Sequence, residues 1–172
     1  MAKEKFSKIL EIKLKDGIVK IKLLPDVAPQ HVRRIIKLAK EGNYDNVAFH
    51  RVIDGFMAQT GDVQFGNMKK GWDSGRAGTG GSTEANLPAE FSKLPFDRGV
   101  LGMARSQDPD SANSQFFIMF AEGHFLNQQY TVFGHVTEGM EFVDKIKRGD
   151  QVNNGSVTDP DSMLRVRILD EA

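Results

Sequence analysis

The chain has 172 residues and no cysteine, and its 23 lysines and arginines balance 23 aspartates and glutamates. This length suits one domain, which we expect to span residues 1–172. The lack of cysteine excludes disulfides, thiolate nucleophiles and zinc–thiolate sites, and it fits a reducing compartment. A net charge of zero argues against nucleic-acid binding, which usually requires a basic excess.

No segment of the sequence predicts membrane insertion or secretion. The longest apolar stretch is Phe116–Ala121, which is far shorter than the ~20 residues that span a bilayer. Residues Met1–Lys5 carry positive charge, but no apolar run follows them as it would in a secretory signal. We therefore expect a cytoplasmic protein that does not bind membranes.

The first elements along the chain are a predicted β-hairpin and a helix. Apolar and polar residues alternate over residues 10–14 and again over 19–23, on either side of Asp16-Gly17, a typical hairpin turn. The period then changes, and Pro29 and Gly42 flank a predicted amphipathic helix. Its apolar face is Val32, Ile35, Ile36 and Ala39.

The rest of the chain predicts short strands and a second helix. We expect strands around residues 47–52, 57–61, 100–104, 115–120, 131–136 and 164–168, and a helix over about 140–147. About eight strands that do not alternate with helices indicate an all-β fold. The predicted architecture is a closed eight-stranded antiparallel barrel with one helix at each end.

Two of these strands present an unusual mixture of side chains on one face. Met57 and Gln59 share a face of one strand, and Gln115 and Phe117 share a face of another, while Phe116 and Phe120 are expected in the core. A glutamine on a core face would cost a few kcal/mol if its amide were unpaired. Apolar groups beside exposed amides are typical of a binding surface.

Five sequence blocks in this order resemble the cyclophilin family over essentially the whole chain. They are residues 49–62, Ala77-Gly78-Thr79-Gly80-Gly81, Gly102-Met103-Ala104-Arg105, Ser114-Gln115-Phe116-Phe117-Ile118 and Val132-Phe133-Gly134. The resemblance, closest to the bacterial-type branch, implies a peptidyl-prolyl cis-trans isomerase that assists protein folding. It also implies a barrel with two helices, an active site on its outer surface, and no cofactor or metal ion.

The resemblance also assigns roles to individual residues. Arg51 matches the catalytic arginine, with Gln59 and Gln115 as the polar groups beside it. Phe56, Met57, Phe117, Phe125, Leu126 and Tyr130 match the proline pocket and its rim. Gly78 borders a neighbouring groove, and the backbone of Ala104 and Arg105 matches the segment that grips the substrate.

Three positions depart from the pattern common in eukaryotic members. Phe125 replaces tryptophan, Tyr130 replaces histidine, and Arg105 replaces asparagine. Both ring exchanges keep an aromatic group, so we expect little loss of catalysis. Phe125 lacks the indole N–H that the family resemblance implies as a donor to cyclosporin, so we expect weak cyclosporin binding. Only the backbone of Arg105 is needed for the implied grip.

The expected partners are proline-containing peptides and unfolded proteins, bound by a monomer. The main alternative is a proline-peptide binding module or chaperone without significant turnover, and a hydrolase is a more distant one. Intact Arg51 and Gln59 favour the enzyme. The four histidines have no metal-ligand spacing, so no metal site is expected.

Overall fold

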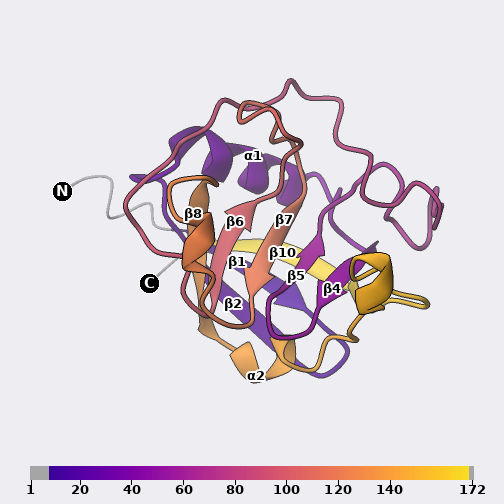
Figure 1. The fold of residues 1–172 in the computed structure, drawn as a ribbon. Helices are drawn as coiled ribbons and strands as arrows, with labels where there is room; N and C mark the ends of the chain where they lie inside the picture. The colour runs from indigo at the N-terminus through magenta and orange to yellow at the C-terminus, as the bar shows by residue number, and fades with distance from the viewer. Residues whose placement is uncertain (1–7, 171–172) are drawn as a thin grey trace.

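The computed structural model describes residues 8–170 as a curled antiparallel sheet with two α-helices (Figure 1). Eight strands follow the order β10-β1-β2-β8-β6-β7-β5-β4, which confirms the prediction of a mainly β fold. These strands are β1 (Lys8–Lys13), β2 (Ile18–Leu23), β4 (Arg51–Ile53), β5 (Met57–Thr60), β6 (Val100–Met103), β7 (Phe116–Met119), β8 (Val132–Glu138) and β10 (Arg165–Asp170). Residues Met1–Lys5, discussed above as a possible signal, lie outside the described range.

The predicted closure of the barrel is not confirmed. In the described residues the edge strands β4 and β10 form no ladder with each other, although β3 (Val47–Ala48) and β9 (Ser162–Met163) pair separately. The edge of β4 is covered by a loop instead, because Val52 N–H donates to the Gly155 carbonyl and Gly149 N–H donates to the Val52 carbonyl, both at 2.8 Å. Gly155 has a left-handed φ of +81°, which a continuous strand cannot include.

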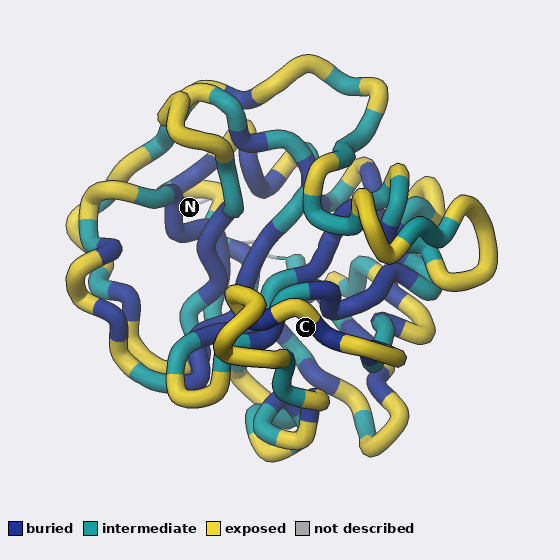
Figure 2. The backbone as a smooth tube through the Cα atoms, turned by 45° about the vertical axis from the view of Figure 1, so that its right-hand side comes forward, coloured by how far each residue is buried: buried dark blue, intermediate teal, exposed yellow. Residues whose placement is uncertain are grey.

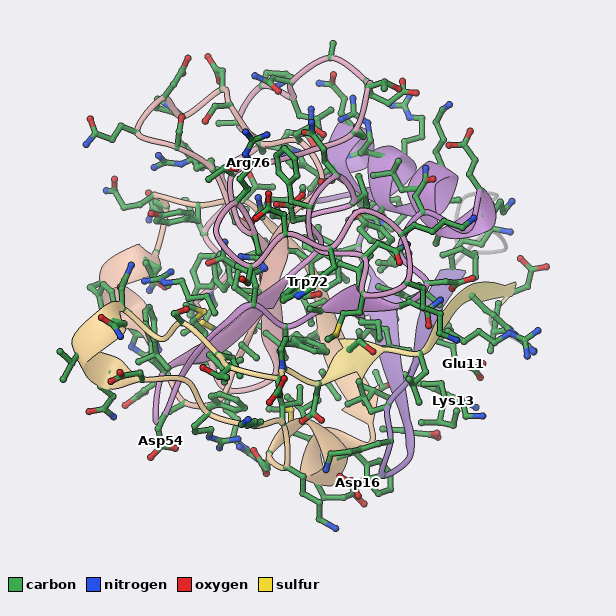
Figure 3. All side chains as sticks on the ribbon, turned by 90° about the vertical axis from the view of Figure 1, so that its right-hand side faces the viewer. Glu11, Lys13, Asp16, Asp54, Trp72 and Arg76 are labelled. Atoms are coloured by element: carbon green, nitrogen blue, oxygen red, sulfur yellow. The ribbon has the colours of Figure 1, made fainter. Side chains whose placement is uncertain are left out.

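β1 and β2 form the predicted hairpin around Asp16-Gly17. Its buried apolar residues face one another across the ladder: Leu10 opposite Ile21 and Ile12 opposite Val19. The intervening Glu11 and Lys13 lie on the surface side of β1, at the right of Figure 3, and Asp16 of the turn lies below them. Alternation along the strand therefore separates the core from the solvent as the sequence predicts.

Helix α1 (Pro29–Lys40) starts at the predicted proline and buries one face. Its buried residues are His31, Val32, Ile35, Leu38 and Ala39, whereas Ile36 is only half-buried. The apolar stripe is thus turned slightly from the predicted one. Lys37 and Lys40 lie in the last turn, where positive charge interacts favourably with the helix dipole.

The N-terminus of α1 is capped by a carboxylate from a distant part of the chain. Glu90 accepts hydrogen bonds from the backbone N–H of Gln30 (3.1 Å) and of His31 (3.0 Å). It also lies 2.6 Å from Nδ1 of His31, whose side chain is fully buried. Burial lowers the pKa of His31, although the bond to Glu90 opposes this effect.

Helix α2 (Met140–Val143) is shorter than the predicted helix over about 140–147, since it ends at Val143. The side chain of Arg148 bonds the carbonyls of Asp144 and Ile146, both at 2.7 Å, which replaces further helical turns. Figure 1 shows α1 and α2 near opposite ends of the sheet. No helix within residues 8–170 has the length and apolar character needed to cross a membrane.

Strand β7 is buried on both faces, and its two faces contribute to two different apolar clusters. Phe116 and Ile118 belong to the main core, whereas Phe117 and Met119 belong to a second apolar cluster with Met57. Figure 2 shows the buried segments in the interior of the molecule and exposed segments in the turns at its periphery. The predicted division of the two faces is confirmed, as is the burial of Phe116 and Phe120.

Candidate active site

The predicted site residues gather along two adjoining cavities. Eleven of the twelve line a cavity of about 610 Å³, which is bordered by β4, β5, β7 and the loops beside them. Gln115 lines a smaller cavity of about 290 Å³ instead, and Gln59, Gly78, Ala104 and Arg105 line both. The fold therefore assembles the predicted set from segments that are far apart in the sequence.

A row of side chains crosses three strands at this site. Arg51 on β4 lies opposite Gln59 on β5, and Gln59 lies opposite Phe117 on β7. Because paired residues on one face of a sheet are close neighbours, the register places the guanidinium, the amide and the ring side by side. The hydrogen-bonded register of the sheet thus brings a polar group and an apolar group together.

A chain of hydrogen bonds fixes one side of Arg51. Its Nη1 donates to Oε1 of Gln59 (3.1 Å), and Nε2 of Gln59 donates to Oε1 of Gln115 (3.0 Å). Nε2 of Gln115 in turn donates to the carbonyls of Gly78 (2.9 Å) and Gly80 (3.0 Å). Each amide therefore has a defined orientation, and the end of the chain is anchored in the glycine-rich loop.

Asn154 holds the other side of Arg51, and the sequence did not predict it. Its backbone carbonyl accepts from Nε of Arg51 and its Oδ1 accepts from Nη2, both at 3.0 Å. Asn154 has a left-handed φ of 58°, which asparagine tolerates better than most residues and which turns both oxygens toward the guanidinium. The Asn154-Gly155 pair is typical of a turn, so the sequence indicated the conformation of this loop but not its contact with Arg51.

The three bonds leave part of the guanidinium free toward the cavity. Of the five N–H donors of an arginine, three are used by Gln59 and Asn154, and two have no partner among the described residues. Burial lowers the pKa of Arg51, with an opposing influence from Tyr130. An arginine starts so far above neutrality that it stays protonated. The site therefore presents a fixed cation with free donors.

An apolar pocket adjoins this cation. Its lining side chains are Phe56, Met57, Phe117, Phe125, Leu126 and Tyr130. Phe117 meets Tyr130 edge to face with ring centroids 5.9 Å apart, and Phe56 lies 5.5 Å from Phe125. Phe125, on the short helix η2 (His124–Leu126), is 72% exposed and forms the outer rim.

The floor of the pocket is held in place from below. Phe96 is fully buried and stacks against Phe117 with centroids 5.8 Å apart. At Gly102 a Cβ atom would lie 2.6 Å from both rings, so only glycine leaves room for this stack. Close packing from behind therefore fixes the position of the Phe117 ring.

The glycine-rich loop that borders both cavities is anchored by a buried carboxylate. Oδ2 of Asp62 accepts from the N–H of Gly78 (2.8 Å) and of Gly80 (3.0 Å). Its Oδ1 accepts from the N–H of Gln64 (3.0 Å) and of Phe65 (2.9 Å). These four bonds compensate the burial of the charge and keep Gly78 beside the cavity.

His50 also lines the larger cavity, and the sequence did not single it out as a site residue. Its ring is buried, and neither ring nitrogen has a hydrogen-bond partner among the described residues. Burial is the main cause that lowers its pKa to about 4, so the ring beside Arg51 is neutral near pH 7.

One group of potential metal ligands lies outside the cavity. Asp97, Glu122 and His124 are exposed, and within residues 8–170 they form the one such group with ligand atoms within 4.8 Å of one another. Nε2 of His124 is 2.7 Å from Asp97, and this bond raises the pKa of the histidine. Metal independence of the protein stays a prediction.

Comparisons with known proteins point to one family. The family model described as cyclophilin-type peptidyl-prolyl cis-trans isomerase/CLD matches residues 9–168. A probable peptidyl-prolyl cis-trans isomerase of Brucella suis is 64% identical over 157 residues, which cover 91% of this chain and 80% of that protein. Peptidyl-prolyl cis-trans isomerase B of Escherichia coli is 40% identical over 140 residues, covering 76% and 79%.

Solved structures give the same result. A cyclophilin-type peptidyl-prolyl cis-trans isomerase from Cryptosporidium parvum superimposes with a TM-score of 0.81 at 25% identity, covering 97% of this chain and all of that one. The structure of the same protein in the presence of the dipeptide Ala-Pro gives a TM-score of 0.79 at 26% identity and covers 95% and 99%.

Proposed function

Because this chain belongs to the family of cyclophilin-type peptidyl-prolyl cis-trans isomerases, we propose that Arg51 and the adjoining pocket carry out its reaction. The isomerase activity follows from the family and from relatives that bear its name. The roles of individual residues are inferred from their geometry. Arg51 is the catalytic group, and Gln59 and Asn154 orient it.

The reaction requires a group that recognises a twisted amide. Resonance gives the peptide C–N bond a rotation barrier of ~18–20 kcal/mol, and X–Pro bonds isomerise in tens to hundreds of seconds without help. Halfway through the rotation the prolyl nitrogen loses conjugation and gains a lone pair. A free N–H of Arg51 can donate to this lone pair only in the twisted state, so it stabilises the transition state selectively.

The apolar pocket holds the proline ring while the rest of the bond rotates. Phe56, Met57 and Phe117 provide the floor and walls, with Leu126 at the rim. A pyrrolidine ring is apolar and rigid, so it gains from burial there and loses little conformational freedom. The Cryptosporidium relative was studied with Ala-Pro, which supports proline-containing peptides as substrates here.

Backbone groups beside the pocket bind the chain that precedes the proline. Ala104 N–H donates to the carbonyl of Gln115 (2.9 Å). The carbonyl of Ala104 and the N–H of Arg105 have no hydrogen-bond partner within residues 8–170, so both can pair with the peptide. Gly78 borders the same groove, where a side chain would crowd His50 at 3.0 Å. An extended peptide would pair there as an added strand. Unfolded proteins offer such segments, and we infer a role in protein folding.

The observation that carries these assignments is the position of Arg51. Three hydrogen bonds hold the guanidinium at the edge of an apolar pocket, and two of its N–H donors are unpaired within residues 8–170. A groove that only bound proline peptides would not require this arrangement. Preorganised donors aimed at developing charge are the usual source of large rate effects.

Exchange spectroscopy on an Ala-Pro peptide tests the proposed function. At catalytic concentrations the protein should raise the cis-to-trans and trans-to-cis rates by the same factor, because both directions share one barrier. The cis/trans ratio should stay as it is without the protein. Peptide binding without any gain in exchange rate would instead identify a proline-peptide binding module.

A further inference from the structure

Arg105 and Tyr130 meet because they follow the same end of two paired strands. Arg105 comes shortly after β6 and Tyr130 shortly before β8, and these strands are antiparallel neighbours with Gly102 opposite Val132. Both residues line the larger cavity. The topology of the sheet therefore places the two side chains together at the wall of the proline pocket.

The side chain of Arg105 contacts both the ring and the backbone of this segment. Its Cζ lies 4.4 Å from the centroid of the Tyr130 ring, within the range of a cation–π contact. Nη2 donates to the carbonyl of Gln129 (2.7 Å), and Nη1 donates to the carbonyl of Ser106 (2.9 Å). Arg105 thus holds the ring of Tyr130 and also the residue that precedes it.

The placement of Arg105 is not that of a solvated surface charge. Its Nε is buried and has no hydrogen-bond partner among the described residues. Leaving a donor unpaired costs free energy, which an arginine extended into water would avoid. The ring contact and three bonds to backbone carbonyls, the third to Gln107 at 3.4 Å, offset this cost, so the side chain is drawn onto Tyr130 by specific interactions.

Besides Arg105, the ring of Tyr130 packs against one apolar cluster, in which Phe117 is its aromatic neighbour. It packs edge to face on Phe117 with an interplanar angle of 84°, and its hydroxyl forms no hydrogen bond within residues 8–170. The ring therefore lies between Phe117 and the Arg105 guanidinium. Without Arg105 the ring would keep only this apolar packing within residues 8–170, with Phe117 as its one aromatic neighbour, and could rotate away from the pocket.

We propose that the side chain of Arg105 is a positioning residue that holds Tyr130 as a wall of the proline pocket. The sequence assigned only the backbone of Arg105 to the site, so this role is additional. Two departures from the eukaryotic pattern, Arg105 and Tyr130, then form a single unit. The inference rests on the proposed function of the pocket, and its test includes a readout that does not depend on turnover.

Steady-state kinetics on an Ala-Pro peptide provides the first arm. Arg105→Gln should raise KM about three- to tenfold, since a misplaced wall weakens binding of the ring in ground and transition states alike, with kcat changed less than about twofold. Arg105→Lys keeps the positive charge but lacks the guanidinium fork, so its KM should lie between those of wild type and Arg105→Gln. Arg33→Gln on the exposed face of α1 is the matched control and should behave as wild type.

A double-mutant cycle tests whether the two residues act together. Tyr130→Ala should raise KM by a similar factor, and the double variant with Arg105→Gln should be no worse than the poorer single variant. If the factors multiply instead, Arg105 acts independently of Tyr130 and the proposal is overturned. An Arg105→Gln variant with the KM of wild type overturns it as well.

Fluorine NMR observes the ring directly. The chain has two tyrosines, so protein labelled with 3-fluorotyrosine should give two signals. Tyr44 is fully buried and serves as the internal reference. Arg105→Gln should shift or broaden the Tyr130 signal and leave that of Tyr44 in place. An unchanged Tyr130 signal overturns the proposal even if the wild type shows no isomerase activity, which separates its failure from that of the proposed function.

Discussion

Asn154→Gly is the sharpest test of how Arg51 is held. Glycine keeps the left-handed conformation and the backbone carbonyl at this position, so the bond from Nε of Arg51 is preserved. The substitution removes the carboxamide side chain, whose Oδ1 is the acceptor for Nη2 at 3.0 Å. A hydrogen bond to a charged group contributes roughly 1–1.5 kcal/mol at a site that is only half-buried.

This free energy sets the expected loss of activity. At about 1.4 kcal/mol per factor of ten, kcat/KM should fall about five- to tenfold, mainly through kcat, because the free donors of Arg51 act in the transition state. Thermal unfolding should confirm that the variant is folded. The control is Val152→Ala on the same loop, where the side chain is 92% exposed.

Protease-coupled or NMR exchange assays on an Ala-Pro peptide measure the effect. A folded Asn154→Gly variant within twofold of wild type would show that the Oδ1 bond does not orient Arg51. An equal loss in Val152→Ala would show that the loop as a whole, and not the bond to Arg51, affects the rate.

Two further predictions concern the pocket rim and the buried histidines. Phe125→Trp adds an indole N–H donor at the exposed rim of the pocket. Calorimetry should therefore show that the variant binds cyclosporin more tightly by about 1 kcal/mol, with little change in peptide turnover. Tight cyclosporin binding by the wild type would refute this prediction. Burial lowers the pKa of His50 to about 4 and also lowers that of His31, so the unfolded chain takes up protons first as the pH falls below about 6.5. Urea unfolding should therefore show a loss of about 2 kcal/mol or more between about pH 7 and 4.5. This loss of stability is best measured in a His124→Asn background. The bond to Asp97 raises the pKa of His124, so this histidine stabilises the folded state as the pH falls and would partly mask the loss. A stability that stays constant over this range would contradict neutral, buried histidines.

The sequence predicted the elements whose signals are local. Alternation around Asp16-Gly17 identified the hairpin, and the split between Gln115 with Phe117 and Phe116 with Ile118 identified the two faces of β7. Both patterns arise from the period of a strand and require no knowledge of distant partners. The resemblance of the motifs to one family added the candidate site residues, which the fold then brings to adjoining cavities.

Features that depend on contacts between distant segments were not predictable. Asn154 approaches Arg51 across 103 positions of the chain, and Glu90 caps α1 across about 60. Arg105 was assigned by its backbone alone, although its side chain lies on Tyr130. The closed barrel was expected from strand count, which does not reveal whether β4 and β10 pair. The cytoplasmic location, the monomeric state and metal independence stay predictions.

The measurement that tests the central assignment most directly compares wild type with Arg51→Ala in peptide exchange. Loss of the preorganised donor should lower kcat/KM by on the order of 10²–10³ while the protein stays folded. NMR titration should still detect peptide binding, because the apolar pocket is intact. Arg51→Lys should restore only part of the rate, since an ammonium group cannot satisfy the oxygens of Gln59 and Asn154 and still present the same donors. A folded Arg51→Ala variant within about twofold of wild type would contradict the catalytic role of Arg51.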